Sequence, residues 1–297
     1  METYWLGVLL AVLSGLSHFS GMLIEKMIIN KLPPDVKLMK NLVRTPLWIF
    51  ALFIRFGLGS AFFMVAQIFI GPAIIPGLMA CGLIVLAIGS VKIIGEKLTV
   101  IELIAILMMI IAITLLGFSE LSIQLSEFNL LEAQFMIRMT IYTSVLTVLG
   151  FLIQLMQKKS ERFRGILLAL LSGFMFSLSN FWTGVLIGVI AHVFSGVFSI
   201  GQLILFIISS IVLVLVNIFG ITKMAASLRY GDASKLVPIQ NTPTQITPSI
   251  VYFLVFLLPP PSILSVVFFT VAIILIIISS FILGKRQAQM GEIKKEI

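Results

Sequence analysis

The sequence predicts an all-α, polytopic membrane protein: about nine transmembrane helices in two inverted four-helix repeats joined by a linking helix. Three observations lead to this fold class: a composition poor in charge, nine long apolar stretches, and an alternating distribution of basic residues. Of the 297 residues, 60% are hydrophobic and only 11% are charged, whereas a soluble domain carries about 25% charged residues. Because so few charges cannot cover a water-facing surface, we expect most of the surface to face lipid.

Nine apolar stretches are long enough to cross a bilayer, whose core of about 30 Å needs roughly 20 residues of helix. They are Tyr4–Ile24, Pro46–Ile70, Pro72–Ile93, Thr99–Phe118, Phe135–Met156, Gly165–Ile190, Gly201–Thr222, Leu236–Leu257 and Ser262–Leu283. Only two connections are long, at 25–45 and 119–134. The first contains DVKLMKNLVR (Asp35–Arg44), which we interpret as an interfacial helix.

The basic residues test this division into spans independently. Lysine and arginine occur in the loops after the first, third, fifth and seventh predicted helices and in the C-terminal tail, and the intervening segments have none. Eighteen of the twenty basic residues therefore fall on one side. Since cytoplasmic loops carry an excess of Lys and Arg, we expect the N-terminus outside, the C-terminus in the cytoplasm, and the protein in the plasma membrane.

The first and second halves of the chain contain an internal repeat. Gly7–Leu16 reads GVLLAVLSGL and Gly165–Phe174 reads GILLALLSGF, with seven identities in ten. GPAIIPG (Gly71–Gly77) has a counterpart in ASKLVPI (Ala233–Ile239). An odd helix between two four-helix copies makes them enter the membrane in opposite directions, an architecture that many secondary transporters share.

The repeat divides one transmembrane domain, residues 1–297, into four parts. These are repeat 1 at 4–118, the linking helix at 135–156, repeat 2 at 165–283, and a cytoplasmic tail at 284–297. In inverted-repeat transporters the substrate lies near the membrane midplane, between the halves.

Several short motifs resemble those of the drug/metabolite transporter superfamily, and of its EamA-type members in particular. They are the proline pair Pro72 and Pro76 and the GEKLT turn (Gly95–Thr99). Members usually have ten helices in two five-helix inverted repeats, so the chain departs from that pattern by one helix.

The nine-helix layout is similar to that of the NIPA-type magnesium transporters in the same superfamily. TPLW (Thr45–Trp48), PAIIPGL (Pro72–Leu78) and KLVPI (Lys235–Ile239) echo that group, as does GEKLT. The group carries a glutamate and an asparagine in the latter half of its second helix. This chain reads GLGSAFFMVAQ there (Gly57–Gln67), without a carboxylate.

These features favour a secondary transporter that moves a small anionic or zwitterionic metabolite by alternating access. A NIPA-like magnesium or divalent-cation transporter is the alternative, and a non-transporting sensor or assembly subunit is the alternative from another class. Besides the bilayer and the transported solute or ion we expect no nucleic-acid partner, because the basic residues are dispersed over loops; the sequence leaves a homodimer open. An enzyme, a cofactor and a metal site are not expected, since the spans show no catalytic pair and Cys81 is the single cysteine.

Arg55 is the first candidate for a substrate-binding residue. It lies nine residues into the second predicted helix, about 14 Å along the axis, too deep to reach the headgroups easily. A guanidinium there could be the counter-ion of a carboxylate or phosphate, or a structural clamp on neighbouring helix ends. The twelve acidic residues, Glu25, Glu96 and Glu102 among them, are assigned to loops or helix ends, so no carboxylate is expected in mid-membrane.

The eighth predicted helix contains the most polar stretch, PIQNTPTQITP (Pro238–Pro248), with three prolines that each remove a backbone donor. Its polar residues repeat every four positions and so align in a stripe that we expect to line the substrate site: Gln240, Asn241, Thr244 and Gln245. Interhelical packing is the alternative.

Three further polar residues lie within predicted spans. Ser14 and His18 share a face of the first helix, where His18 could relay a proton or pack structurally. Asn180 shares a face of the sixth helix with Gly173, Ser177 and Gly184. Small residues at that spacing favour close helix contact, and a ligand role for Asn180 is the alternative.

Overall fold

The computed structural model describes residues 2–33, 36–70, 75–121 and 128–296, and the regular secondary structure in these ranges is entirely helical. Short π-helical turns, labelled η, continue several of the helices. The elements are α1 (Glu2–Lys31), α2 (Leu38–Val43), α3 (Pro46–Leu52), η1 (Phe53–Leu58), α4 (Gly59–Ile70), α5 (Ile75–Ala80), α6 (Gly82–Gly89), η2 (Ser90–Ile94), α7 (Val100–Phe118), α8 (Ala133–Lys159), α9 (Arg164–Phe194), α10 (Ile200–Tyr230), α11 (Ala233–Ile250), η4 (Val251–Val255) and α12 (Ile263–Glu296).

Seven helical segments in the described ranges are long and apolar enough to cross a membrane. They are Tyr4–Lys31, Pro46–Ala66, Val100–Phe118, Ala133–Lys159, Arg164–Phe194, Ile200–Tyr230 and Ile263–Gln287. The chain is an all-α, polytopic membrane protein. This part of the sequence prediction is confirmed.

The other two predicted spans differ from these seven. In the region predicted to span at 72–93, a shorter apolar helix covers Leu78–Ile94, and the predicted start at Pro72 lies outside the described residues. The region predicted at 236–257 is helical in α11 and η4. It falls outside the seven because its polar residues and prolines replace an apolar run. The count of nine spans therefore stays a prediction.

Several helices extend beyond the apolar stretches that predicted them. Helix α1 continues to Lys31, seven residues past the predicted end at Ile24, and α12 runs through the region assigned to the tail. Polar residues such as Lys, Glu and Gln have helix propensities close to those of Leu and Met. A helix can therefore continue past the end of an apolar run, and hydropathy alone does not show where it ends. The helix expected at 35–44 is present as the six-residue α2.

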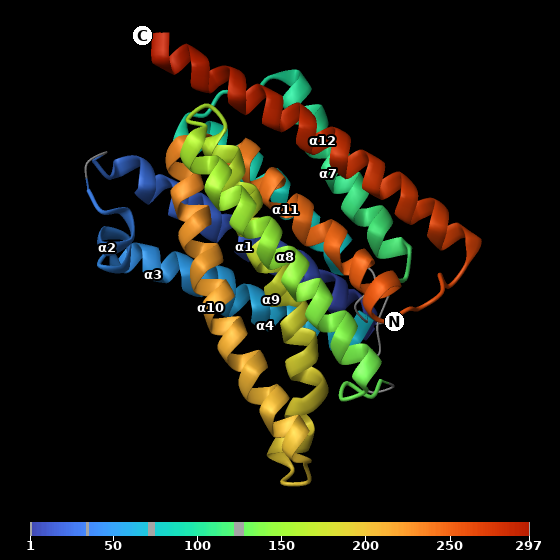
Figure 1. Ribbon diagram of the computed structural model, residues 1–297. Helices are drawn as coiled ribbons and strands as arrows, with labels where there is room; N and C mark the ends of the chain where they lie inside the picture. The colour runs from blue at the N-terminus through green and yellow to red at the C-terminus, as the bar shows by residue number, and fades with distance from the viewer. Residues whose placement is uncertain (1, 34–35, 71–74, 122–127, 297) are drawn as a thin grey trace.

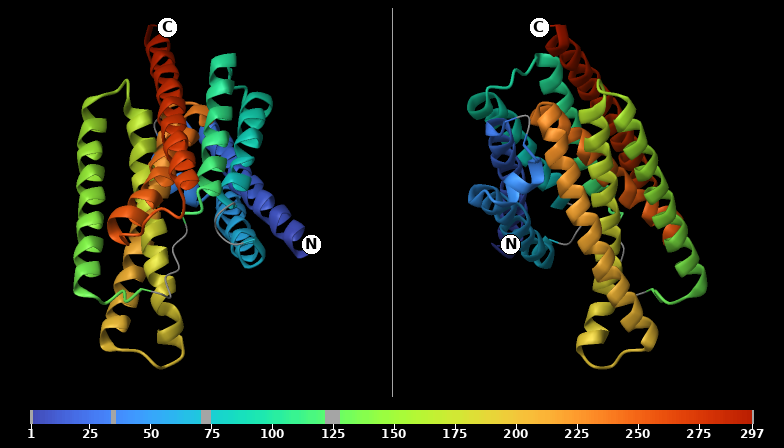
Figure 2. Two further views of the ribbon diagram at one scale, coloured as in Figure 1. Left: turned by 90° about the vertical axis from the view of Figure 1, so that its right-hand side faces the viewer. Right: turned by 60° about the vertical axis from the view of Figure 1, so that its left-hand side comes forward.

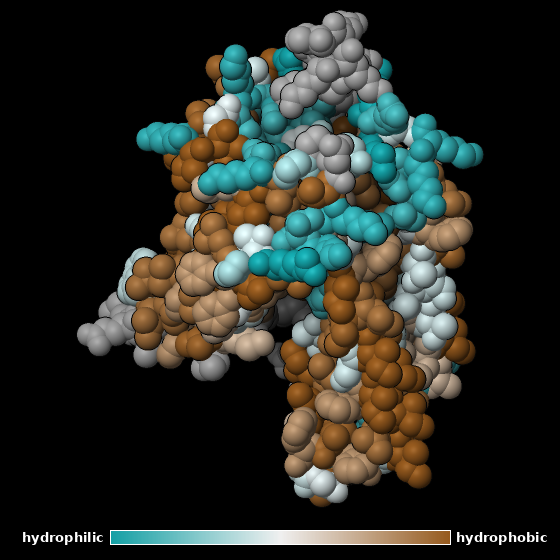
Figure 3. Space-filling model, turned by 90° about the vertical axis from the view of Figure 1, so that its left-hand side faces the viewer, coloured by the Kyte–Doolittle hydropathy of each residue, from teal (hydrophilic) through white to brown (hydrophobic). Residues whose placement is uncertain are grey.

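The helices form one bundle with a protruding hairpin (Figures 1 and 2). Helices α9 and α10 are each 31 residues long, about 46 Å at 1.5 Å per residue, and their joined ends project away from the chain's C-terminus. Helix α1 packs against α3, η1 and α4, while α12 lies along α7. Hydrophobic side chains cover the hairpin, and hydrophilic ones gather over the upper part of the face in Figure 3.

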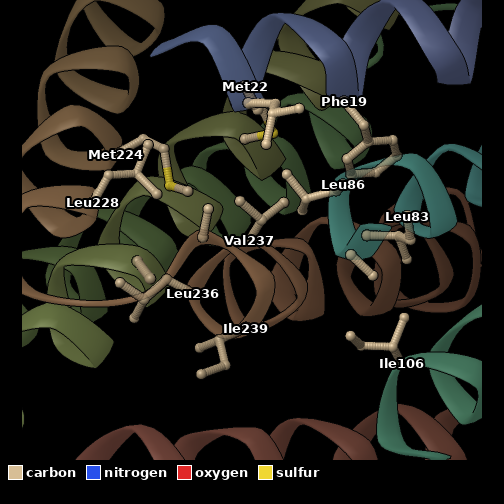
Figure 4. Packing of buried hydrophobic residues seen from close by; sticks show 14 of the residues in the cluster. Phe19, Met22, Leu83, Leu86, Ile106, Met224, Leu228, Leu236, Val237 and Ile239 are labelled. Carbon is tan, nitrogen blue, oxygen red and sulfur yellow. The ribbon is translucent and has the colours of Figure 1, made fainter. Parts of the chain in front are cut away.

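A hydrophobic core joins the first half of the chain to the second (Figure 4). Met22 of α1 and Leu86 of α6 lie in it together with Met224 of α10 and Val237 of α11. These four side chains are at most 1% exposed. The two halves therefore share one packed interior near the ends of α1 and α10 and the start of α11.

Candidate functional site

One face of α1 carries four small or polar residues toward the helix formed by α3, η1 and α4. Ser14, His18, Gly21 and Glu25 follow one another at intervals of four, three and four residues, which places them on one side of a helix. Gly21 allows close approach, because a Cβ there would lie 2.8 Å from the Ala51 carbonyl oxygen and 2.9 Å from the Arg55 Cβ.

The centre of this contact is an ion pair between Glu25 and Arg55. The Arg55 guanidinium donates to Glu25 Oε1 at 3.2 Å, and the side chains of Arg55 and Glu25 are 1% and 0% exposed. The Oε2 atom of Glu25 and the Nε atom of Arg55 are buried without a hydrogen-bond partner among the described residues. A buried polar atom without a partner is unfavourable. The pair can therefore accept one further hydrogen bond at Glu25 Oε2 and donate one at Arg55 Nε.

Glu25 corrects the prediction that the chain leaves the first helix at Ile24. The apolar stretch ends at Ile24, which suggested that Glu25 begins a loop. In the structure Glu25 is instead six residues inside the end of α1 and buried. Arg55 supplies the opposite charge that makes this position tolerable, since buried charges in proteins are paired.

Aromatic rings complete the surroundings of Arg55. Its guanidinium carbon lies 4.6 Å from the centre of the Phe56 ring and 5.5 Å from that of Phe176 in α9. The rings of Phe56 and His18 form a T-shaped pair with their centres 6.3 Å apart. Phe176 brings the second half of the chain to the ion pair, so the pair lies where the halves meet.

A π-helical turn places Arg55. Residues Phe53–Leu58 form η1, between the α-helical segments α3 and α4. A π-turn inserts an extra residue into the helical repeat, shifts the faces of the helix on either side, and is frequent at functional sites. Within η1 Arg55 is buried, whereas Phe53 is 57% exposed.

Ser14 makes a structural contact, and His18 lies beside it. The Ser14 hydroxyl donates to the Gly59 carbonyl oxygen at 2.7 Å, which joins α1 to α4. The ring of His18 is half-buried and stacks edge-on against Phe19 and Phe56. Both residues are therefore adjacent to the ion pair along the same face of α1.

The predicted polar stripe lies on a helix that its three prolines do not break. Helix α11 is α-helical from Ala233 to Ile250. Gln240 is 2% exposed, Asn241 is 8% exposed, and Thr244 and Gln245 are half-buried. The Oε1 atom of Gln240 is buried without a partner in the described part of the chain, whereas the Thr244 hydroxyl donates to the Gln240 carbonyl at 3.2 Å.

Asn180 makes no hydrogen bond with the ion pair or with the stripe among the described residues, and its role as a ligand stays a prediction. Its side chain is exposed on α9. The polar contact in this region is made by Asn217 of α10, which donates to the Ser179 hydroxyl at 2.7 Å and which the sequence did not single out.

A second polar cluster links the halves at the end of the bundle where α11 begins. The Lys26 ammonium donates to the carbonyls of Leu228 and Gly231. The Glu96 carboxylate accepts from the backbone amides of Ala233 and Ser234 at 2.7 and 3.1 Å, and from the Ser234 hydroxyl at 2.7 Å. Because Asp232 makes no side-chain cap, the glutamate of the GEKLT turn caps α11 from the other half of the chain.

Lys235 extends this cluster. It is fully buried and lies 2.7 Å from Asp232 and 3.5 Å from Glu102. Arg229 binds the carbonyls of Pro33 and Val36 in the first loop. The sequence analysis assigned the charged residues of this cluster to loops. It could not pair them, because their partners are far away along the chain. The GEKLT motif was the one local pattern that pointed to this region.

Replacing Glu96 with alanine is expected to lower the free energy of unfolding by about 1–2 kcal/mol, since two amides at a helix N-terminus lose their acceptor. Thermal unfolding in detergent measures this. Glu132→Ala is the matched control, because Glu132 also precedes a helix but makes no cap. An equal loss in both variants would contradict the assigned role of Glu96.

Two contacts in the first half of the chain have similar contacts in the second half. Ser14 donates to the Gly59 carbonyl at 2.7 Å, and its counterpart Ser172 donates to the Gly220 carbonyl at 2.8 Å. The following glycines are equally crowded. A Cβ on Gly15 would collide with the Met79 carbonyl, and a Cβ on Gly173 would collide with the Gln240 carbonyl.

Comparison of the chain with protein-family models, with curated proteins and with solved structures gave no match.

Proposed function

We propose that this protein is a secondary transporter of the drug/metabolite transporter type, which moves a small metabolite by alternating access. In this proposal nine spans form two inverted four-helix repeats with α8 as the linking helix. The observation that carries it is the Glu25–Arg55 pair, fully buried, with one acceptor and one donor atom unpartnered, and next to Phe176 of the other half. Buried ionisable groups in membrane helices are usually functional.

The repeated contacts support the division into two related halves. The matching decamers pair Ser14 with Ser172 and Gly15 with Gly173, and these residues make equivalent contacts. Their partners are similar as well: each serine donates to a glycine carbonyl, that of Gly59 or Gly220, and each glycine lies against a backbone carbonyl, that of Met79 or Gln240. Chance similarity between apolar decamers would not reproduce the partners.

The ion pair favours a zwitterionic substrate over a simple anion. An anion that bound Arg55 would leave the Glu25 carboxylate buried without its partner, at a cost of several kcal/mol. A zwitterion can offer a carboxylate to Arg55 and an ammonium to Glu25, so that both charges stay paired. The rings of Phe56 and Phe176 would cover the apolar part of such a substrate.

The polar contacts between the halves support a state closed at one end. Lys26, Glu96, Arg229 and Lys235 all join the halves where α11 begins, the end that the basic loops predict to be cytoplasmic. Transport by alternating access requires these contacts to break when the opposite end closes.

A NIPA-like magnesium transporter is the second candidate, and Glu25 is the observation that favours it. Its buried carboxylate supplies the kind of oxygen ligand that Mg²⁺ prefers. Two observations oppose it. Arg55 is already paired with that carboxylate. The described residues contain no group of three or more His, Cys, Asp or Glu side chains that could hold a metal ion.

Transport by the protein in proteoliposomes distinguishes these functions. We expect saturable uptake of labelled amino acids, little uptake of dicarboxylates, and loss of uptake in Arg55→Leu but not in Arg44→Gln, which changes an exposed arginine of the first loop. Magnesium flux that persists in Arg55→Leu would overturn this proposal in favour of the second. No flux of any of these solutes would favour a sensor or assembly subunit.

A further inference from the structure

A cavity of about 720 Å³ lies at the end of the bundle where α9 and α11 begin. Its walls come from both halves of the chain, since residues of α1 and the GEKLT turn face residues around the start of α9 and the end of α10. Five basic side chains line it: Lys26, Lys97, Arg162, Arg164 and Arg229. The apolar cluster of Figure 4 includes Met22, one helical turn before Lys26 in α1.

Basic side chains outnumber the acidic groups that line this cavity, five to three. Three carboxylates line it, those of Glu96, Glu161 and Asp232. Glu96 accepts from the two first amides of α11, and Asp232 accepts from the buried Lys235. The lining is therefore positive overall, and a negative ligand would be attracted.

The start of α9 supplies the groups that recognise an anion. Its first three residues, Arg164, Gly165 and Ile166, line the cavity. The N-terminus of a helix this long carries partial positive charge and amides that lack helical acceptors. The Arg164 amide donates to the Glu161 carbonyl at 3.4 Å, so the next amides, those of Gly165 and Ile166, are the ones offered to a ligand. The Arg164 guanidinium lies 4.8 Å from the centre of the Tyr230 ring, and its Nε is buried without a hydrogen-bond partner among the described residues.

We propose that this cavity binds a phosphate-bearing ligand, held by Arg164, Lys97 and the first amides of α9. Arginine matches the geometry of phosphate oxygens better than other cations do, and helix N-termini are common phosphate sites. The volume is in the range of pockets for small organic molecules, so it admits a phosphorylated metabolite of nucleotide size or a phospholipid headgroup as well as a single phosphate.

The ligand would also affect the conformation of the protein. Because it touches both halves, it stabilises the closed end and slows the opening that transport requires. This consequence rests on the proposed transport function; binding itself does not.

Binding is tested with pyrophosphate added to the full chain in nanodiscs of phosphatidylcholine, measured by calorimetry. We expect saturable binding that Arg164→Gln and, separately, Lys97→Gln weaken by about tenfold, the loss of one charge-assisted hydrogen bond. Lys97 is exposed, so its variant folds even where Arg164→Gln does not. Arg44→Gln, which lies outside the cavity, should bind as the original protein does.

A second arm identifies the source of the phosphate. Nanodiscs that also contain phosphatidylglycerol should block pyrophosphate binding if lipid headgroups occupy the cavity, and leave it intact if the ligand is soluble; either result supports the site. Equal binding by all variants, no binding in either membrane, or the same heat from chloride at equal ionic strength would overturn it.

Hydrogen exchange separates this site from the transport proposal. Bound pyrophosphate should slow exchange of the amides at 231–236, next to the Glu96 contacts, without any solute being transported. Binding without slower exchange would overturn the conformational consequence and leave the site in place. Failure to transport in the proteoliposome assay would leave both results unchanged.

Discussion

Replacing Arg55 with leucine is expected to abolish uptake and to lower the free energy of unfolding by about 3–5 kcal/mol, because Glu25 is left charged and buried without a partner. The same loss of stability is expected from Glu25→Leu, which strands the guanidinium of Arg55. Thermal unfolding in detergent and amino-acid uptake in proteoliposomes measure the two effects separately.

The double variant Glu25→Leu/Arg55→Leu decides what the pair is for. Apolar replacement of both members of a buried ion pair is often neutral or stabilising, so we expect the double variant to unfold near the temperature of the original protein. It should nevertheless remain inactive, because neither charge is left to bind the substrate. Normal uptake by a stable double variant would mean that the pair is only a structural clamp.

Gly15→Ala and Gly173→Ala are expected to destabilise the protein by similar amounts, about 1–3 kcal/mol or more. In each case the added Cβ would collide with a backbone carbonyl, that of Met79 or that of Gln240, which moves only if its whole helix moves. Thermal unfolding of the two single variants measures the effect.

The control for these variants is Gly284→Ala in α12, where a Cβ would meet its nearest neighbour, the Ile239 side chain, at 3.9 Å, an ordinary contact distance. Alanine favours helix over glycine by up to about 1 kcal/mol, so this variant should be neutral or slightly more stable. Sensitivity at Gly15 with tolerance at Gly173 would contradict the equivalence of the two halves.

The sequence predicted the helices well and their ends poorly. Long apolar runs determine where a helix can cross a bilayer. An unpaired peptide group in hydrocarbon is very unfavourable, and a helix pairs its peptide groups within the same segment. They do not determine where the helix stops, and Glu25 illustrates the consequence. It follows an apolar run by one residue, yet it is buried, because α1 extends past the run and Arg55 lies opposite.

The prolines of α11 illustrate a second limit. Each proline lacks the amide that would bond to the carbonyl four residues earlier, and three such losses in one helix favour a break. The helix is continuous instead. Its start is capped by Glu96 and its body is packed against α9, and such tertiary contacts override local propensity.

The sequence by itself determined the membrane location, the helical class, and the position of Arg55 inside an apolar helix, because all three follow from local composition and spacing. The candidate residues His18 and Arg55 were found this way, as was the stripe that begins at Gln240. Only the tertiary structure decided that Glu25 pairs with Arg55, that Glu96 caps α11, and that Ser14 and Ser172 make equivalent contacts. These contacts join residues 30 to 137 positions apart, and a local pattern cannot specify a partner at that distance.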